Sequence, residues 1–259
     1  MLVFAAIMPH PPESIPGIGK PGSFGLIKKT LDAFEKLRIG LEKADPETIV
    51  IISPHAYSEE YTFVINSASE LRGNLREIGS NKEYKYANDS KITDELNFLC
   101  LQKELMARLH PSLLDYGALI PLYHLTKNIR PKVVHLAFSM MSYEFHYRYG
   151  ETLQKIIENS GRRVAIIASG NLSHRLTPDS PAGFYPKAKE FDKKVIRYLE
   201  NNEISELMLL DKRNITKSAE CGLRPIMILL GALHGKKYKF NLLSYEYPTG
   251  IGYLTARLL

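Results

Sequence analysis

The sequence predicts an α/β protein, folded as one layered domain over residues 1–259. A central sheet, mostly parallel but mixed, is expected with helices on both of its faces. Three observations predict this class. Apolar runs alternate with longer stretches of helical periodicity, the length suits one large core, and two strands joined by a turn form the tail.

Apolar and β-branched runs predict the central strands. These runs cover residues 2–7, 48–52, 132–138 and 163–168. They are predominantly apolar and do not alternate regularly with polar residues. Both faces of the sheet are therefore expected to be covered.

Helices are predicted where apolar residues recur at helical spacing. These stretches are residues 24–43, 93–109, 145–158, 186–200 and 226–233. The polar stretch 71–90 between them is expected to be a loop or a meander. Near the end of the chain, residues 239–245 and 251–257 flank a turn at Pro248-Thr249-Gly250, which predicts an antiparallel strand pair.

Composition narrows the classes of partner. The net charge is +6, but the basic residues are scattered in pairs such as Lys28-Lys29, a pattern typical of solvated helix faces, so no nucleic acid is expected as a partner. No apolar run approaches the ~20 residues needed to cross a bilayer, and no membrane partner is expected. Cys100 and Cys221 cannot build a disulfide framework, which favours a reducing cytoplasm.

Two histidines follow predicted strands in similar surroundings. His10 lies between prolines after the first strand, and His55 directly follows Pro54 after the second. Ligands bind outside the carboxyl ends of strands in open α/β sheets, and proline stiffens the backbone there. The two imidazoles can therefore meet at one ligand, although either histidine alone is more typical of a loop residue that hydrogen-bonds its neighbours.

A third histidine and an acidic residue complete the candidate set. His174 follows the strand at 163–168, where a neutral imidazole suits acid–base chemistry; the alternative is a surface histidine beside a helix-capping Ser173. Glu220 precedes the helix at 226–233. It either stabilises the helix start or supplies a metal-binding oxygen beside two imidazoles.

Four segments occur in the order found in class III extradiol ring-cleaving dioxygenases, a superfamily that includes a Memo-like branch. They are Pro9-His10-Pro11, Ser53-Pro54-His55-Ala56, Gly170-Asn171-Leu172-Ser173-His174 and Ala219-Glu220-Cys221-Gly222. The chain resembles this superfamily over nearly its whole length. The resemblance implies Fe(II) on His10, His55 and Glu220, with His174 handling protons. It also implies dioxygen and a small catechol-like or phenolic substrate as partners, and either a homo-oligomer or an accessory subunit is compatible with it.

Two departures from the superfamily pattern define an alternative. In Memo-like relatives a cysteine is the third ligand, so Cys221 is the alternative to Glu220, and a thiolate would favour Zn or Cu(I); Cys221 is otherwise an inert buried residue. Tyr116 stands where many ring-cleaving members have histidine in an Asp-His-Gly turn. The alternative function is therefore a Memo-like metal-binding or peptide-binding protein without ring cleavage.

Substrate contacts are predicted at Asn171, Tyr116 and His124, near the ends of strands or beside the turn before Pro121. For Tyr116 and His124, simple packing in the core is the competing interpretation. Arg224 is expected to pair with Glu220. The other histidines are interpreted structurally: His135 as a satisfied core residue, and His110, His146 and His234 as surface or helix-end residues.

Overall fold

The computed structural model describes residues 1–18 and 22–259. Eight strands form one sheet in the order β6-β3-β7-β2-β8-β1-β10-β9. The strands are β1 (Leu2–Met8), β2 (Thr48–Ser53), β3 (Phe63–Asn66), β6 (Ala107–His110), β7 (Lys132–Ala137), β8 (Val164–Ser169), β9 (Asn241–Glu246) and β10 (Tyr253–Arg257). The predicted α/β class with a mixed sheet is confirmed.

The four strands predicted from apolar runs are β1, β2, β7 and β8, and they form the parallel centre of the sheet. Strand β8 lies between β1 and β2. Its register pairs Ser169 with Met8 on one side and Ala168 with Ile52 on the other. The carboxyl ends of these three strands therefore meet at one edge of the sheet.

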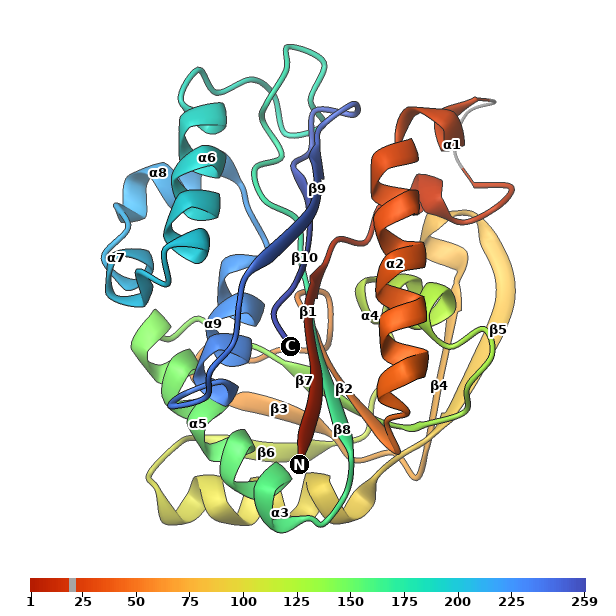
Figure 1. Cartoon of the computed structure of the whole chain (residues 1–259), viewed down its shortest axis with the longest axis vertical. Helices are drawn as coiled ribbons and strands as arrows, with labels where there is room; N and C mark the ends of the chain where they lie inside the picture. Colours follow the sequence, from red (N-terminus) through yellow and green to blue (C-terminus); the bar gives the residue numbers. More distant parts are fainter. Residues whose placement is uncertain (19–21) are drawn as a thin grey trace.

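Each central strand sends alternate side chains into two separate cores. In β2, Val50 and Ile52 enter the core on one face, whereas Ile49 and Ile51 enter the core on the other. The first core lies under α3 (Ser90–Gln102), α5 (Tyr143–Asn159), α6 (Ala188–Glu200) and α9 (Leu223–Ala232). The second lies under α2 (Lys28–Ala44) and α4 (Tyr116–Leu125), on the right in Figure 1. Covering on both faces explains why these runs are predominantly apolar.

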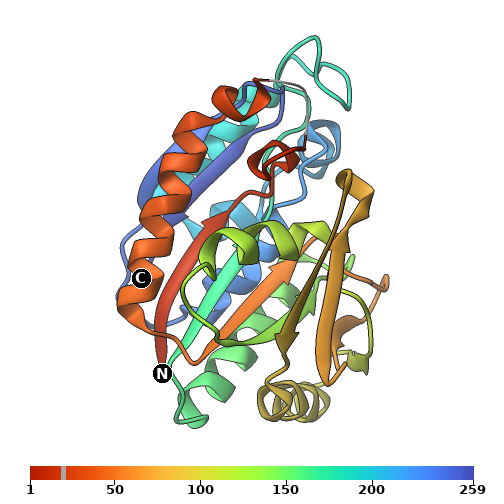
Figure 2. The same ribbon diagram turned by 90° about the vertical axis from the view of Figure 1, so that its right-hand side faces the viewer.

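The predicted antiparallel pair at the end of the chain is confirmed. Strand β10 pairs antiparallel with both β9 and β1, and so joins the tail to the parallel centre. Strand β3 is antiparallel to β7 near the opposite edge. Figure 2 shows the twisted sheet from the side that α2 and α4 cover.

Some predicted elements differ from the structure. The helix predicted at 93–109 ends at Gln102, because Glu104 takes a left-handed backbone (φ 56) and the chain then forms edge strand β6. The helix predicted at 24–43 is divided at Ile27 into α1 (Ser23–Leu26) and α2.

The polar stretch is a hairpin of β4 (Glu70–Leu75) and β5 (Ser80–Ala87), with η2 (Arg76–Ile78) between them. The remaining short helices are η1 (Pro12–Ser14), α7 (Ile204–Met208) and α8 (Lys212–Ser218). Among residues 1–18 and 22–259, no helix combines the length and the apolar character needed to span a membrane.

Candidate metal centre

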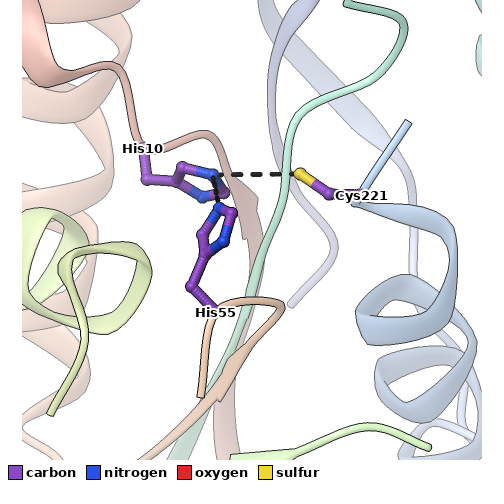
Figure 3. A group of neighbouring side chains, drawn as sticks. All are labelled: His10, His55 and Cys221. Atoms are coloured by element: carbon purple, nitrogen blue, oxygen red, sulfur yellow. Dashed lines mark hydrogen bonds between the residues drawn. The ribbon is translucent and has the colours of Figure 1, made fainter. Parts of the chain in front are cut away.

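Three side chains from distant parts of the chain converge at the carboxyl edge of the central strands. They are His10 after β1, His55 after β2 and Cys221 before α9, and their ligand atoms all lie within 4.8 Å of one another. Figure 3 shows the three side chains pointing toward a common point. His10 is buried, Cys221 is half-buried and His55 is exposed, so the group opens to solvent on the side of His55.

The distances within this group suit one metal ion. The Nε2 atoms of His10 and His55 are 3.2 Å apart, and Cys221 Sγ is 3.8 Å from His10 Nε2. Tetrahedral bonds of about 2.0 Å to nitrogen and 2.3 Å to sulfur would hold two nitrogens roughly 3.3 Å apart and nitrogen and sulfur roughly 3.6 Å apart. Two of the three donor pairs therefore have the separation expected around a single ion, and the third pair, His55 and Cys221, lies within 4.8 Å.

Ser169, the last residue of β8, fixes the orientation of His10. Its Oγ lies 2.9 Å from His10 Nδ1 and donates a hydrogen bond of 2.6 Å to the carbonyl of Gly117. That carbonyl is free because its partner in α4, four residues on, would be Pro121, which has no N–H. Since the single Ser169 hydrogen is used there, Ser169 accepts from His10 Nδ1–H. The lone pair of His10 Nε2 is thus left facing the other donors.

Burial lowers the pKa of His10 well below its ordinary value, and the neighbouring His55 lowers it further. The ring is therefore neutral near pH 7, the state in which imidazole binds a metal. For Cys221, burial raises the pKa to about 12 despite a hydrogen bond from Asn171 N–H to Sγ. Without a metal the thiol keeps its proton, and metal binding would release it.

Asn171 joins the His10 and Cys221 segments. Its Oδ1 accepts a hydrogen bond of 3.2 Å from the backbone N–H of His10, and its Nδ2 lies 3.1 Å from His10 Nε2. Its own backbone N–H lies 3.2 Å from Cys221 Sγ. The predicted substrate contact at Asn171 is therefore within the cluster, where the amide also braces two of its members.

Tyr116, at the start of α4, lies beside His55. Its hydroxyl is 2.9 Å from His55 Nε2, and the two rings stack with centroids 4.3 Å apart. Burial raises the pKa of Tyr116 to about 12, so the phenol keeps its proton. Tyr116 therefore lies at the site, with a hydroxyl aimed at the donor atom of His55.

A buried polar chain supports the His55 segment. Asp115 accepts from Ser53 Oγ at 2.5 Å and from Ala118 N–H at 3.1 Å, so it also caps α4. Its other oxygen lies 3.0 Å from Nε2 of His135, whose Nδ1 receives an N–H from Asn66. Burial would raise the pKa of Asp115, but the hydrogen bond and charge of His135, together with Ser53, lower it to about 2.

His135 is 1% exposed, and both of its ring nitrogens have partners, as expected for a satisfied core residue. Sequence reasoning did not identify Ser169 or Asp115 as supports of the site. The signal for Ser169 was Pro121, since a proline inside a helix frees one carbonyl for an outside donor.

The structure does not bring Glu220, the predicted third ligand, into this group of three side chains. Its Oε2 accepts a hydrogen bond of 2.7 Å from the N–H of Leu223 and so caps the start of α9. Glu220 lines a separate cavity of about 450 Å³ together with Tyr143 and Arg224. Burial raises the pKa of Glu220 to about 7. The third position falls to the alternative residue, Cys221.

His174 is close enough for its charge to act on His10, and the charge of His55 acts on it. Its backbone N–H donates to the carbonyl of Ser218, which ties its loop to the segment before Cys221. Its Nδ1 is buried and has no hydrogen-bond partner among the described residues. Burial lowers the pKa of His174, so the ring is neutral near pH 7 and can accept a proton.

Other predicted residues lie outside the group. His124 Nε2 contacts Ser14 Oγ at 3.1 Å, its ring packs against Phe34, and it therefore anchors η1 instead of facing the three donors. Arg224 makes no ion pair with Glu220 among residues 1–18 and 22–259. Its guanidinium instead lies over the rings of Phe138 and Tyr143. His146 lies in the first turn of α5, as the helix-end interpretation expected, but it is fully buried and not at the surface.

Comparison with known families bears directly on this geometry. A family model described as the catalytic LigB subunit of aromatic ring-opening dioxygenase matches residues 4–256. The chain belongs to the LigB family. The expected resemblance to class III extradiol dioxygenases is thereby confirmed over nearly the whole chain.

Individual relatives agree with this assignment. The chain is similar to Protein CA_C1420 of Clostridium acetobutylicum (31% identity, covering 97% of this chain and 56% of that protein), so it spans little more than half of that relative. It is also similar to 3,4-dihydroxyphenylacetate 2,3-dioxygenase of Escherichia coli (25% identity, 92% of each chain). A third relative is the 2-aminophenol 1,6-dioxygenase beta subunit of a Pseudomonas species (21% identity, 81% of this chain and 77% of that one).

The fold of this LigB-family chain also has a solved counterpart. The crystal structure of the uncharacterized protein JW3007 from Escherichia coli K12 superposes with a TM-score of 0.73 at 18% identity. The match covers 99% of this chain and 100% of that one. At this identity the likeness supports the fold alone.

Proposed function

We propose that this LigB-family chain is a metal-dependent dioxygenase of the extradiol type that opens the ring of a small catechol-like or phenolic substrate with dioxygen. The observation that carries the proposal is the convergence of His10, His55 and Cys221 within 4.8 Å, at the end of three adjacent strands. Family membership and similarity to ring-opening dioxygenases support the reaction class.

The donors fit a mononuclear ion. Two neutral imidazoles and one thiolate provide three ligands on one side of the point they share, and the exposed side of His55 leaves room for small molecules. When bound, the metal would act as a Lewis acid toward the phenolic oxygens of the substrate. Fe(II) is the metal proposed for the dioxygenase; a thiolate in place of a carboxylate also suits Zn or Cu(I).

The side chains around the three donors have separate roles in the proposed reaction. His174, neutral near pH 7, accepts a proton from the substrate hydroxyl and later returns it. The protonated hydroxyl of Tyr116 donates a hydrogen bond to a substrate oxygen. Asn171 holds His10 and Cys221 in register.

One observation favours a second candidate function. The third donor is a cysteine, as in Memo-like relatives, and not the carboxylate of the two-histidine, one-carboxylate face used by Fe(II) oxygenases. A Memo-like metal-binding protein without ring cleavage would use the same three residues to hold Zn or Cu(I). The two candidates share a metal site and differ in chemistry.

Reconstitution separates them. The chain is loaded anaerobically with Fe(II) or with Zn, mixed with several catechols and exposed to air while the absorbance of a yellow ring-opened product is followed. Product formed only by the Fe(II)-loaded chain supports the dioxygenase. Stoichiometric Fe(II) without product from any catechol, combined with tighter binding of Zn or Cu(I), supports the second candidate.

Paired variants at neighbouring positions test the ligand assignment. Cys221→Ala should abolish stoichiometric metal binding, whereas Glu220→Gln, which keeps an oxygen to accept from Leu223 N–H, should retain it. Metal content by elemental analysis decides between them, and circular dichroism checks that both variants fold. Loss of metal in Glu220→Gln with retention in Cys221→Ala would return the third position to the carboxylate.

A further inference from the structure

A second cavity lies away from the three metal donors, between strand β5 and the carboxyl end of α4. Its volume is about 490 Å³. In Figure 1 the β4–β5 hairpin and α4 lie together on the right of the sheet. The lining consists mainly of tyrosines and basic residues: Lys82, Tyr84, Lys85, Tyr86, Tyr123, Lys127 and Arg130. We call this cavity the tyrosine–lysine cleft.

The charged side chains that line the cleft are all positive. Four of its lining residues are basic, and none of the lining residues is acidic. Lys82, Lys85, Lys127 and Arg130 form no ion pair with any acidic residue in the described ranges 1–18 and 22–259. Arg130 donates to the carbonyls of Thr126, Lys127 and Ile129, which orders its guanidinium without neutralising it. The cleft is therefore complementary to a ligand with more than one negative charge.

The same cleft carries aromatic surface. The rings of Tyr84 and Tyr123 meet edge to face, with centroids 6.2 Å apart. The ammonium group of Lys82 lies 5.4 Å from the Tyr84 ring and 5.6 Å from the Tyr123 ring, and that of Lys127 lies 5.9 Å from Tyr123. Cations and ring faces are thus interleaved within one cavity. This combination is the one by which proteins bind a phosphate and an aromatic base together.

We propose that the tyrosine–lysine cleft is a binding site for a nucleoside polyphosphate. The base packs against Tyr84 and Tyr123, and the phosphates lie among Lys82, Lys85 and Lys127. The volume suits one nucleotide, since ligand pockets for molecules of this size span about 300–1,000 Å³. The same chemistry would also be offered by the phosphorylated end of a single-stranded nucleic acid.

The cleft is separate from the metal centre. Helix α4 begins at Tyr116, which contacts His55, and its far end lines the cleft through Tyr123. Tyr116 and Tyr123 are seven residues apart in this helix, which at 1.5 Å a residue separates them by roughly 10 Å along its axis. Binding in the cleft is therefore measurable with the metal removed, and the result does not depend on the proposed dioxygenase activity.

The test titrates the metal-free chain of residues 1–259 with ATP by isothermal calorimetry at low and at moderate salt. Adenosine supplies the ring without charge, and tripolyphosphate supplies charge without the ring. ATP is expected to bind one to one, more weakly at higher salt, and about tenfold more tightly than either fragment. Failure to detect ATP binding, or equal affinity for tripolyphosphate, would overturn the proposal.

Variants locate the binding. Changing both Lys82 and Lys127 to Gln should weaken ATP by about tenfold or more, and Tyr84→Leu should weaken ATP while leaving tripolyphosphate unchanged. Lys194→Gln is the matched control, because Lys194 also stacks on a tyrosine, Tyr198, at 5.5 Å but lies outside the cleft. Melting temperatures verify that each variant folds.

An equal loss in Lys194→Gln and in the double variant would mean non-specific attraction and overturn the assignment. A 5′-phosphorylated single-stranded oligonucleotide that displaces ATP and binds more tightly identifies nucleic acid as the source of the ligand; weaker binding identifies the free nucleotide. Both results support the tyrosine–lysine cleft as the binding site.

Discussion

Replacing Ser169 by alanine should have two effects that can be measured separately, one on the free energy of unfolding and one on metal affinity. The hydroxyl serves two buried groups, because it accepts from His10 Nδ1–H at 2.9 Å and donates to the Gly117 carbonyl at 2.6 Å. Pro121 cannot replace the second bond, since it lacks an N–H. Each group left unpaired costs about 1–3 kcal/mol, so Ser169→Ala should lower the free energy of unfolding by about 2–6 kcal/mol.

The effect on the metal follows from the same contact. Without an acceptor at Nδ1, the His10 ring can place its proton on Nε2, the atom that faces His55 and Cys221. Loss of such a supporting hydrogen bond lowers metal affinity by roughly 10–100-fold. Competition of the folded variant against a chromophoric chelator measures this loss.

Ser139→Ala provides the control for this experiment. Ser139 is also fully buried and follows a central strand, and its Oγ accepts from the N–H of Met141 and is hydrogen-bonded to none of the three donors among the described residues. This variant should lose stability but keep wild-type metal affinity. If Ser169→Ala binds metal as tightly as the wild type, the proposed role of Ser169 in fixing the His10 ring is refuted.

Three further predictions concern residues around the site. Burial raises the pKa of Asp192 to about 7, so the folded state favours the protonated carboxyl. The stability that this proton contributes is complete below pH 4 and falls by roughly 4 kcal/mol as pH rises through 7. Urea unfolding across this pH range should detect the fall in the wild type but not in Asp192→Asn, which cannot lose the proton. His124→Ala should lower the free energy of unfolding by about 2 kcal/mol or more, because the contact with Ser14 and the packing against Phe34 are lost. Metal affinity in a chelator assay should not change. A changed affinity would show that His124 acts on the three donors. His174→Ala should keep the metal by elemental analysis and lose turnover, whereas loss of metal would make His174 a ligand.

The centre of the fold could be predicted from the sequence because its strands are buried on both faces. Residues 49–52, for example, are all aliphatic and fully buried, which is typical of a strand covered on both faces. Strands β3 and β6 escaped prediction for the opposite reason. Each is four residues long, and β6 includes exposed Arg108, so its pairing with β3 at the sheet edge defines it more than its own composition does.

The two histidines of the site were predictable because strand topology places them. Parallel strands β1, β8 and β2 are neighbours, so residues that follow them must share one edge of the sheet. This arrangement brings His10 and His55 close together. Ser169 belongs to the same edge, but its role depends on a free carbonyl in α4, which becomes visible only when the helix and the strand are packed together.

The third donor was harder to predict, because Glu220 and Cys221 are adjacent and the choice between them depends on backbone geometry. Ala219 ends α8 in a left-handed conformation (φ 51), and the chain then runs beside the end of β8. There a Cβ on Gly170 would lie 2.3 Å from Gly222 Cα, so only glycine permits the approach.

This approach brings the Cys221 N–H to the Asn171 carbonyl at 3.1 Å and the Asn171 N–H to Cys221 Sγ at 3.2 Å. The sulfur is thereby held beside His10. A carboxylate donor from Glu220 would require this turn to rotate, which would break both contacts and remove the cap on Leu223 N–H. The close passage of two backbone segments therefore selects sulfur over oxygen at the site, and with it the range of metals that the site favours.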